Sequence, residues 1–190
     1  MATQNQLIMQ RSKEQLAGKW GNAAVGTLIF LAIVGAASCT YVGALILQGP
    51  LTVGFLIYIA SLIYEGKNDF NKIFDGFRNF VNTLVAGLVY SLLVAIGYVL
   101  LIVPGVILSC GLSMAFFILI DRPETSGMDA LSESWNLMNG HKWEFFCLNC
   151  RFIGWALLCV LTCGIGYLWL FPYMYASYCN FYRNLRYGTF

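Results

Sequence analysis

The sequence predicts an all-α polytopic membrane protein with six transmembrane helices. They form three Gly/Pro-turned hairpins, each preceded by an amphipathic interfacial helix. Two observations predict this fold class. Hydrophobic residues make up 59% of the 190 residues and charged residues only 11%, whereas soluble domains carry about 45–50% apolar and about 25% charged residues. In addition, three long stretches contain no Lys, Arg, Asp or Glu, namely 20–64, 79–120 and 152–182.

Each uncharged stretch provides enough chain for two membrane helices. The stretches contain 45, 42 and 31 residues, and apolar residues extend the third back to about Trp143, whereas one span needs roughly 20 residues. Each stretch also contains Gly or Pro near its middle, and both residues favour turns. The predicted turns are Gln48-Gly49-Pro50, Val103-Pro104-Gly105 and Cys163-Gly164-Ile165-Gly166.

These turns define the hairpins in order along the chain. The predicted helix pairs are 20–44 with 50–64, 80–102 with 104–120, and 143–162 with 165–185. Six spans place ten of the eleven Lys and Arg residues on one side, together with both termini, and leave Arg151 inside the fifth span. Because basic residues concentrate in cytoplasmic loops, the sequence predicts that both termini are cytoplasmic.

The segments before the hairpins have helical periodicity. Such segments are typical of amphipathic helices that lie in the membrane interface; alternatively, the three pack on one another as a soluble cap. Each meets its hairpin at a glycine, namely Gly18, Gly76 or Gly140. The apolar residues that repeat on one side are Met9, Leu16 and Trp20 in the first segment, Phe70, Ile73, Phe74 and Phe77 in the second, and Met128, Leu131, Trp135 and Met138 in the third.

The chain is predicted to be a single membrane domain with a weak threefold repeat. The units run over about 1–64, 65–123 and 124–190. Such repeats occur in transporters, but they also arise by duplication of structural hairpins, so the repeat does not decide the function. Aromatic residues near span ends favour interfacial belts; these are Trp20, Trp143, Trp169, Tyr173, Tyr175, Tyr178, Tyr182 and Tyr187.

The candidate functional residues lie where the third amphipathic segment enters the fifth span. Arg151 is a charge within a span, which by default marks a functional site, although Arg also reaches to the interface along its apolar stem. Glu144 lies seven residues earlier on nearly the same helix face. With His141, Lys142 and Trp143, these residues form the candidate lipid or partner contact. Two interpretations of Arg151 stay open: contact with Glu144 or a lipid phosphate, and contact with a substrate or partner.

No catalytic residue, metal site or cofactor is predicted. His141 is the single histidine, and one histidine without convergent ligands makes a poor metal site. Cys147 and Cys150 form a C-x-x-C motif, but Cys159 and Cys163 project from other sides of the same helix, and buried cysteines usually behave as small apolar residues. An intramembrane enzyme acting on lipid stays a minor alternative, and it would require Arg151, Glu144 and His141 to converge.

The C-terminal third contains motifs that resemble a known family. They include Ala130-Leu131-Ser132-Glu133-Ser134, Asn139-Gly140-His141-Lys142, Phe152-Ile153-Gly154-Trp155 and Phe171-Pro172-Tyr173; Gly49-Pro50 matches upstream. The chain resembles the bacterial integral membrane proteins of domain of unknown function 975, which are similar to the membrane domain of glycerophosphoryl diester phosphodiesterases. The resemblance implies a helical fold in the bacterial cytoplasmic (inner) membrane and no settled activity. Arg151 departs from the family, which usually has a small or uncharged residue there.

Two functional hypotheses follow. The preferred one is a non-enzymatic accessory protein that binds membrane lipids, a membrane protein partner or a second copy of itself. The net charge of +2 is too small to indicate a nucleic-acid partner. The alternative is a small transporter or channel, which requires the polar residues within the spans to face one pathway. Those residues are Asn82, Thr83, Ser91, Ser109, Ser113, Asn149, Thr162, Ser177 and Asn180.

Overall fold

The computed structural model describes residues 4–37, 41–66, 68–162 and 164–188, and this part of the chain is all-α, without a strand. The all-α class is therefore confirmed. The helices are α1 (Gln4–Leu16), α2 (Trp20–Ala37), α3 (Tyr41–Ala60), the π-helical turn η1 (Ser61–Glu65), the 3₁₀ helix η2 (Phe70–Phe77), α4 (Phe80–Leu100), α5 (Ile102–Leu112), α6 (Ala115–Asp121), α7 (Gly127–Leu137), α8 (Lys142–Leu161) and α9 (Tyr167–Tyr187).

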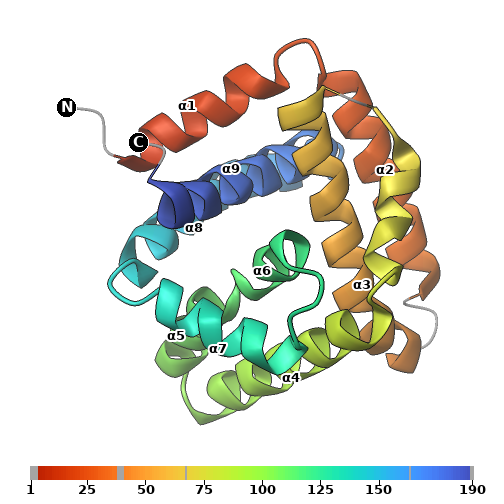
Figure 1. The fold of residues 1–190 in the computed structure, drawn as a ribbon. Coiled ribbons are helices and arrows are strands. Elements are labelled where there is room, and N and C mark those ends of the chain that lie inside the picture. The colour runs from red at the N-terminus through yellow and green to blue at the C-terminus, as the bar shows by residue number, and fades with distance from the viewer. Residues whose placement is uncertain (1–3, 38–40, 67, 163, 189–190) are drawn as a thin grey trace.

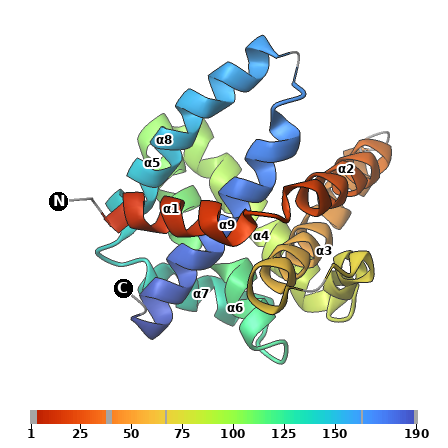
Figure 2. The ribbon, with the colours of Figure 1, turned by 90° about the horizontal axis from the view of Figure 1, so that it is seen from above.

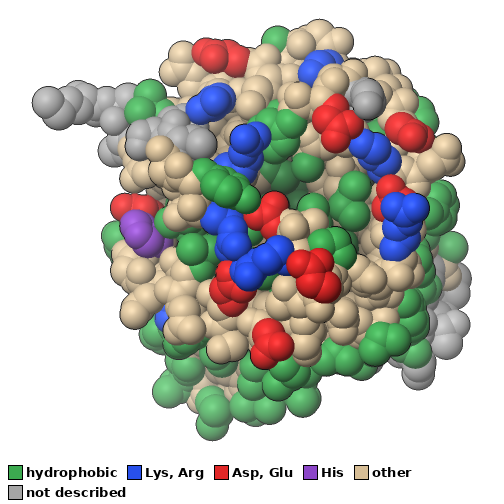
Figure 3. Space-filling model, viewed as in Figure 1, with side chains coloured by type: hydrophobic (Ala, Val, Ile, Leu, Met, Phe, Trp, Pro, Cys, Tyr) green, Lys and Arg blue, Asp and Glu red, His purple; other side chains and the backbone are tan. Residues whose placement is uncertain are grey.

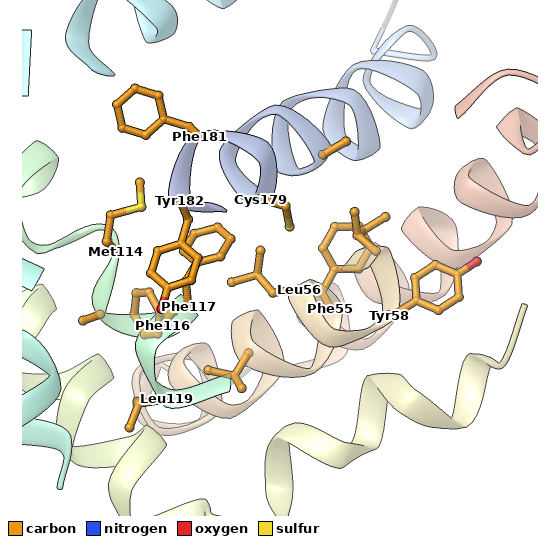
Figure 4. Packing of buried hydrophobic residues seen from close by; sticks show 14 of the residues in the cluster. Phe55, Leu56, Tyr58, Met114, Phe116, Phe117, Leu119, Cys179, Phe181 and Tyr182 are labelled. Carbon is orange, nitrogen blue, oxygen red and sulfur yellow. The ribbon is translucent and has the colours of Figure 1, made fainter. Parts of the chain in front are cut away.

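The helices surround α3, α6 and α9, which meet in the interior (Figure 1). Figure 2 shows α8 and α9 as one arm of the molecule, α2 and α3 as another, and α1 crossing α9. The buried side chains fill the space between the three central helices (Figure 4). Aromatic rings dominate this core: Phe117 of α6 stacks on Tyr182 of α9 with centroids 5.4 Å apart, and Phe55 of α3 meets Tyr175 edge-on at 5.1 Å.

Four segments of the described chain are long and apolar enough to cross a membrane, and the bent pair α1–α2 would be a fifth, with an angle of 97°. The four are Ile46–Glu65, Phe80–Leu100, Ile102–Asp121 and Lys142–Leu161. The finer prediction of six spans in three hairpins is not confirmed. Helix α9 falls outside the set because several tyrosines and the polar residues Asn180, Arg183, Asn184 and Arg186 lower its hydropathy.

The first predicted turn, Gln48-Gly49-Pro50, is wrong. Helix α3 continues through Pro50, although proline removes one backbone hydrogen bond. Gly49 instead allows close helix packing, since a Cβ there would overlap the carbonyl oxygen of Thr83 on α4. The boundary between α2 and α3 falls at residues 38–40, which lie outside the described part of the chain.

The second predicted turn lies close to the observed one. Helix α4 ends at Leu100, Leu101 is extended, and α5 begins at Ile102. Pro104 is tolerated in the first turn of α5 because backbone N–H groups there have no partner within the helix. The predicted helix 104–120 agrees with the candidate span Ile102–Asp121, which comprises α5 and α6 with Ser113 and Met114 between them.

The third predicted turn agrees with the structure where it is described. It lies between the end of α8 and the start of α9, and Gly164 there has a φ of +84°. Cys163, the first residue of that predicted turn, lies outside the described residues.

The three amphipathic segments are helical as predicted, namely α1, η2 and α7. Gly18 and Gly140 adopt positive φ at two junctions, a conformation that favours glycine. The predicted apolar faces are only partly buried: Ile73, Leu131 and Met138 are buried, but Phe74 and Met128 are each 55% exposed. The main neighbours of these segments are the long helices, since α1 packs on α9, η2 on α3, and α7 on α4 and α6.

Candidate functional site

The predicted site residues begin at the entrance to α8. His141 Nδ1 lies 3.1 Å from Glu144 Oε2, and both side chains are exposed. Asn5 of α1 donates from Nδ2 to the backbone oxygen of Glu144 at 2.9 Å, which holds α1 against this junction. Lys142 turns the other way, because its Nζ lies 3.1 Å above the centroid of the Trp135 ring of α7.

Trp143 and Arg151 lie farther along the same helix. Trp143 is 72% exposed, and its ring stacks on Phe146 with centroids 5.4 Å apart. Arg151 is half-buried and follows Glu144 by seven residues, or about 10 Å of helix rise. The structure therefore places His141 beside Glu144, Lys142 and Trp143 on a second side, and Arg151 deeper along α8.

An apolar groove of about 630 Å³ lies between α5 and the first turns of α8. Its walls are apolar side chains, and Lys142 is the one charged residue that lines it among the described residues. The groove is thus apolar along its length, with a cation and an indole ring at the α8 entrance. Its lining residues are Ile102, Val103, Val106, Ile107, Cys110, Lys142, Trp143 and Phe146.

A second hollow, the central cavity, has a volume of about 480 Å³ and opens to the surface, since Tyr98 and Ile153 in its wall are 47% and 56% exposed. Val106, Cys110 and Phe146 line both this cavity and the groove, so the two are neighbours. None of the described residues that line the cavity is charged. Its polar side chains are Gln48, Thr52, Tyr90, Tyr98, Ser109, Ser113, Asn149, Tyr175 and Tyr178.

The polar residues singled out in the sequence divide between this cavity and other places. Ser109, Ser113 and Asn149 line the cavity, and Asn149 Oδ1 accepts a 2.6 Å hydrogen bond from Tyr178 Oη. Asn180 is buried elsewhere and donates to Ser12 Oγ of α1 at 2.9 Å. Sequence reasoning missed the tyrosines of the cavity, because it assigned Tyr175 and Tyr178 to an interfacial belt.

Ionic side chains gather on the face that is shown in Figure 3. At the charged cluster, Glu133 of α7 accepts hydrogen bonds from Arg122 and from Arg186 Nη1, the latter at 2.8 Å. Arg186 Nε also lies 3.4 Å from Asp121 Oδ2. Asp121 accepts hydrogen bonds from Tyr182 and Tyr187 at 2.9 and 2.8 Å. This network joins α6, α7 and α9, and the sequence analysis did not detect it.

A third hollow, the vestibule, lies beside the charged cluster and has a volume of about 300 Å³. The guanidinium of Arg183 lies 4.1 Å above the centroid of the Tyr64 ring at this site. Leu56 and Phe117 line both the vestibule and the central cavity. The vestibule residues are Leu56, Ala60, Tyr64, Phe117, Ile120, Asp121, Cys179, Tyr182, Arg183 and Tyr187.

The charged cluster yields a pH-dependent prediction. The hydrogen bond from Arg186, together with Arg122, holds the pKa of Glu133 below its ordinary value. Glu133 therefore stabilises the fold above its unfolded-state pKa of about 4.3, and this contribution is lost as the pH falls through the folded-state pKa. We expect Glu133→Gln to lower Tm near neutral pH and the difference from wild type to shrink in acid. Thermal unfolding across pH measures this.

The control for this prediction is Glu124→Gln. Glu124 is exposed, so its replacement should leave Tm nearly unchanged at each pH. A Tm loss in Glu133→Gln that is the same in acid and at neutral pH would contradict the assigned role of Glu133.

No group of three or more His, Cys, Asp or Glu residues is arranged to hold a metal ion in the part of the chain that the structure describes. The described cysteines are free thiols: Cys110, Cys147, Cys150, Cys159 and Cys179.

Together, these features define a helical protein with several helices apolar enough to cross a membrane, an outward apolar groove and a half-open cavity with no charged side chain among the described residues that line it. Residues 98–188 match the model of the family described as Protein of unknown function (DUF975), which supports the resemblance of this chain to that family. The matched residues include α5 to α9 and every residue of the predicted site. No curated protein and no solved structure matches the chain. The similarity to glycerophosphoryl diester phosphodiesterases stays a prediction.

Proposed function

We propose that this chain is a non-enzymatic integral membrane protein that binds a phospholipid in the groove between α5 and α8. We further propose that it resides in the bacterial cytoplasmic membrane, with both termini in the cytoplasm. The observation that supports lipid binding is the polarity of the groove. Aliphatic side chains line its length, and Lys142 and Trp143 stand at one end.

An acyl chain suits the apolar part of this groove. Ile102 and Val103 are 72% and 67% exposed, and Ile107 is 44% exposed. An acyl chain in the groove would cover this surface with a partner of the same polarity. In a bilayer such packing gains from close van der Waals contact rather than from water exclusion, so a shaped groove holds a lipid more tightly than a smooth helix face does.

The head group suits the entrance to α8. Lys142 supplies a positive charge, and lysine binds phosphate as a point charge. Its ammonium group is held at the groove by the Trp135 ring, 3.1 Å from the centroid. Trp143 is exposed beside it, and tryptophan favours the level of the lipid head groups. An anionic phospholipid with its phosphate at Lys142 satisfies all three features.

The remaining predicted residues fit a second contact at the same junction. His141 and Glu144 form an exposed pair that a membrane protein partner or a second copy of the chain could reach. Arg151 stays a second candidate for a lipid phosphate, because it lies within the same helix, deeper in the proposed span. The variant Arg151→Ala therefore belongs in the lipid-binding experiment.

The test is native mass spectrometry of the protein released from bilayers that contain anionic and zwitterionic phospholipids. We expect Ile107→Trp, which fills the groove, to lower the ratio of lipid-bound to lipid-free protein by about tenfold, the effect of losing about 1.4 kcal/mol of binding free energy. We expect Lys142→Gln to remove the preference for the anionic lipid and Lys142→Arg to preserve it, because only the charge matters for a phosphate contact.

Leu157→Trp is the matched control. Leu157 is 65% exposed on α8 but does not line the groove, so lipid retention should equal that of the wild type. Equal lipid loss in Ile107→Trp and Leu157→Trp would overturn the groove as the binding site. Loss of the anionic preference in Arg151→Ala, but not in Lys142→Gln, would place the phosphate at Arg151 instead.

A further inference from the structure

We propose that the central cavity and the vestibule are two halves of one pathway for small uncharged polar solutes. The pathway is closed in this conformation where Leu56 of α3 meets Phe117 of α6. This inference goes beyond lipid binding, because it concerns the central cavity and the vestibule rather than the groove. It starts from the two shared wall residues, since Leu56 and Phe117 line both hollows.

The lining of the central cavity indicates what could pass. Thr52, Ser109, Ser113 and Asn149 line this cavity. Each donates a hydrogen bond to a backbone carbonyl of its own helix, and its side-chain oxygen stays an acceptor. Polar side chains within a membrane are costly unless they face the protein interior or water. No charged side chain lines the cavity among the described residues, and moving an ion into such a space is unfavourable. The chemistry therefore suits an uncharged solute with hydrogen-bonding groups.

The vestibule provides the aqueous end of this pathway. It contains Asp121 and Arg183, which have opposite charges, and the hydroxyl-bearing residues Tyr64 and Tyr187. Because the two signs are both present, the vestibule does not select strongly for either. It shares Asp121 with the charged cluster of Asp121, Glu133 and Arg186.

Leu56 and Phe117 form a tight barrier. They are 1% and 7% exposed, and Figure 4 shows Leu56 directed toward the stacked rings of Phe117 and Tyr182. Neither side chain has a polar group that could replace the hydration of a solute at this point. An apolar constriction between two polar hollows prevents passage by excluding water.

Helix α6 is the element that could open the barrier. It contains seven residues and follows α5 after Ser113 and Met114, which both keep right-handed helical backbone angles. Its other end is held through Asp121, which accepts the hydrogen bond from Tyr182. Because Phe117 lies on this short helix and stacks on Tyr182, a change in the charged cluster would also move the barrier.

Cys110 provides a natural reporter, since it lines both the central cavity and the groove. The protein is placed in lipid nanodiscs and treated with a charged methanethiosulfonate, which cannot enter through the bilayer, and Cys110 modification is followed by peptide mass spectrometry. We expect slow modification in the wild type and at least about tenfold faster modification in Leu56→Ala and in Phe117→Leu, because the thiolate must meet the reagent in water.

Leu62→Ala is the matched control, because Leu62 is also 1% exposed on the same helical segment but lines neither hollow. An uncharged maleimide, which can also approach Cys110 from the groove through the bilayer, should show a smaller rate difference between the variants than the charged reagent does. Proteoliposomes with Leu56→Ala should also take up glycerol faster than those with Leu62→Ala. Phe117→Leu keeps an apolar side chain, so it tests the barrier even if Leu56→Ala does not fold.

Three results would overturn the pathway: wild-type Cys110 that reacts as fast as in Leu56→Ala, equal rates in Leu56→Ala, Phe117→Leu and Leu62→Ala, or faster labelling without faster glycerol uptake. Lipid retention by the same preparations is measured separately. If lipid is retained while the labelling rates are equal, the pathway fails and lipid binding stands.

Discussion

Gly54→Ala is expected to cause a larger loss of stability than an alanine substitution at any other described glycine. A Cβ at Gly54 of α3 would overlap the carbonyl oxygen of Ile73 on η2, and a Cβ at Gly76 would overlap the carbonyl oxygen of Pro50. Both obstacles are backbone atoms, so a side-chain rotation cannot relieve them. The two helices would have to separate, at a cost of about 3 kcal/mol or more. Thermal or denaturant unfolding in detergent measures the loss.

Gly154→Ala is the control for that experiment. Gly154 is a helical glycine on α8, and a Cβ there meets no atom within 4 Å. The substitution should leave stability unchanged or raise it slightly, because alanine favours helix more than glycine does. If Gly154→Ala and Gly54→Ala lose the same stability, close contact between α3 and η2 is not what requires glycine.

Phe152→Ala is expected to have the next largest effect, about 3 kcal/mol or more, in line with other buried phenylalanines. Phe152 is 1% exposed. Its ring meets Tyr173 edge-on at 5.4 Å and Tyr178 at 6.2 Å, so it holds α8 against α9. Tyr178 also donates a hydrogen bond to Asn149. Loosening this contact should therefore weaken the wall of the central cavity, which unfolding and Cys110 labelling would both detect.

Trp155→Ala separates this packing effect from the loss of any aromatic ring on α8. Trp155 is larger than Phe152 but 55% exposed, and a substitution on the surface usually changes stability by less than about 0.5 kcal/mol. A Tm loss in Trp155→Ala that equals the loss in Phe152→Ala would contradict the packing of α8 on α9 through Phe152.

The fold could be predicted where local signals act alone. Charge spacing predicted the helical class, and the turn between α4 and α5 follows from Pro104 in a first helical turn. Gly49 and Pro50 were misleading, because glycine favours both turns and close helix packing. The contact that decides between these is with Thr83 on α4. A contact across 34 residues of sequence leaves no local pattern, so the sequence alone could not resolve it.

The candidate site also combines residues that local sequence signals predicted with residues that they did not. Lys142 and Trp143 could be found from their place at the entrance to a predicted span. The opposite wall of the groove, at Ile102 and Ile107, belongs to another helix and has no distinctive sequence signal. The contact between Glu133 and Arg186 joins residues 53 positions apart. These features depend on tertiary packing, which periodicity within one helix does not report.

The central claim is that the groove between α5 and α8 binds a phospholipid, and photo-crosslinking tests it most directly. The protein is reconstituted with an anionic phospholipid that carries a photoreactive group on its acyl chain, and the adducts are mapped by peptide mass spectrometry. We predict that adducts concentrate at Ile102, Ile107 and Phe146 and decline in Ile107→Trp but not in Leu157→Trp. Adducts spread evenly over the exposed apolar faces of α4 and α8, with no change in Ile107→Trp, would contradict a specific lipid site.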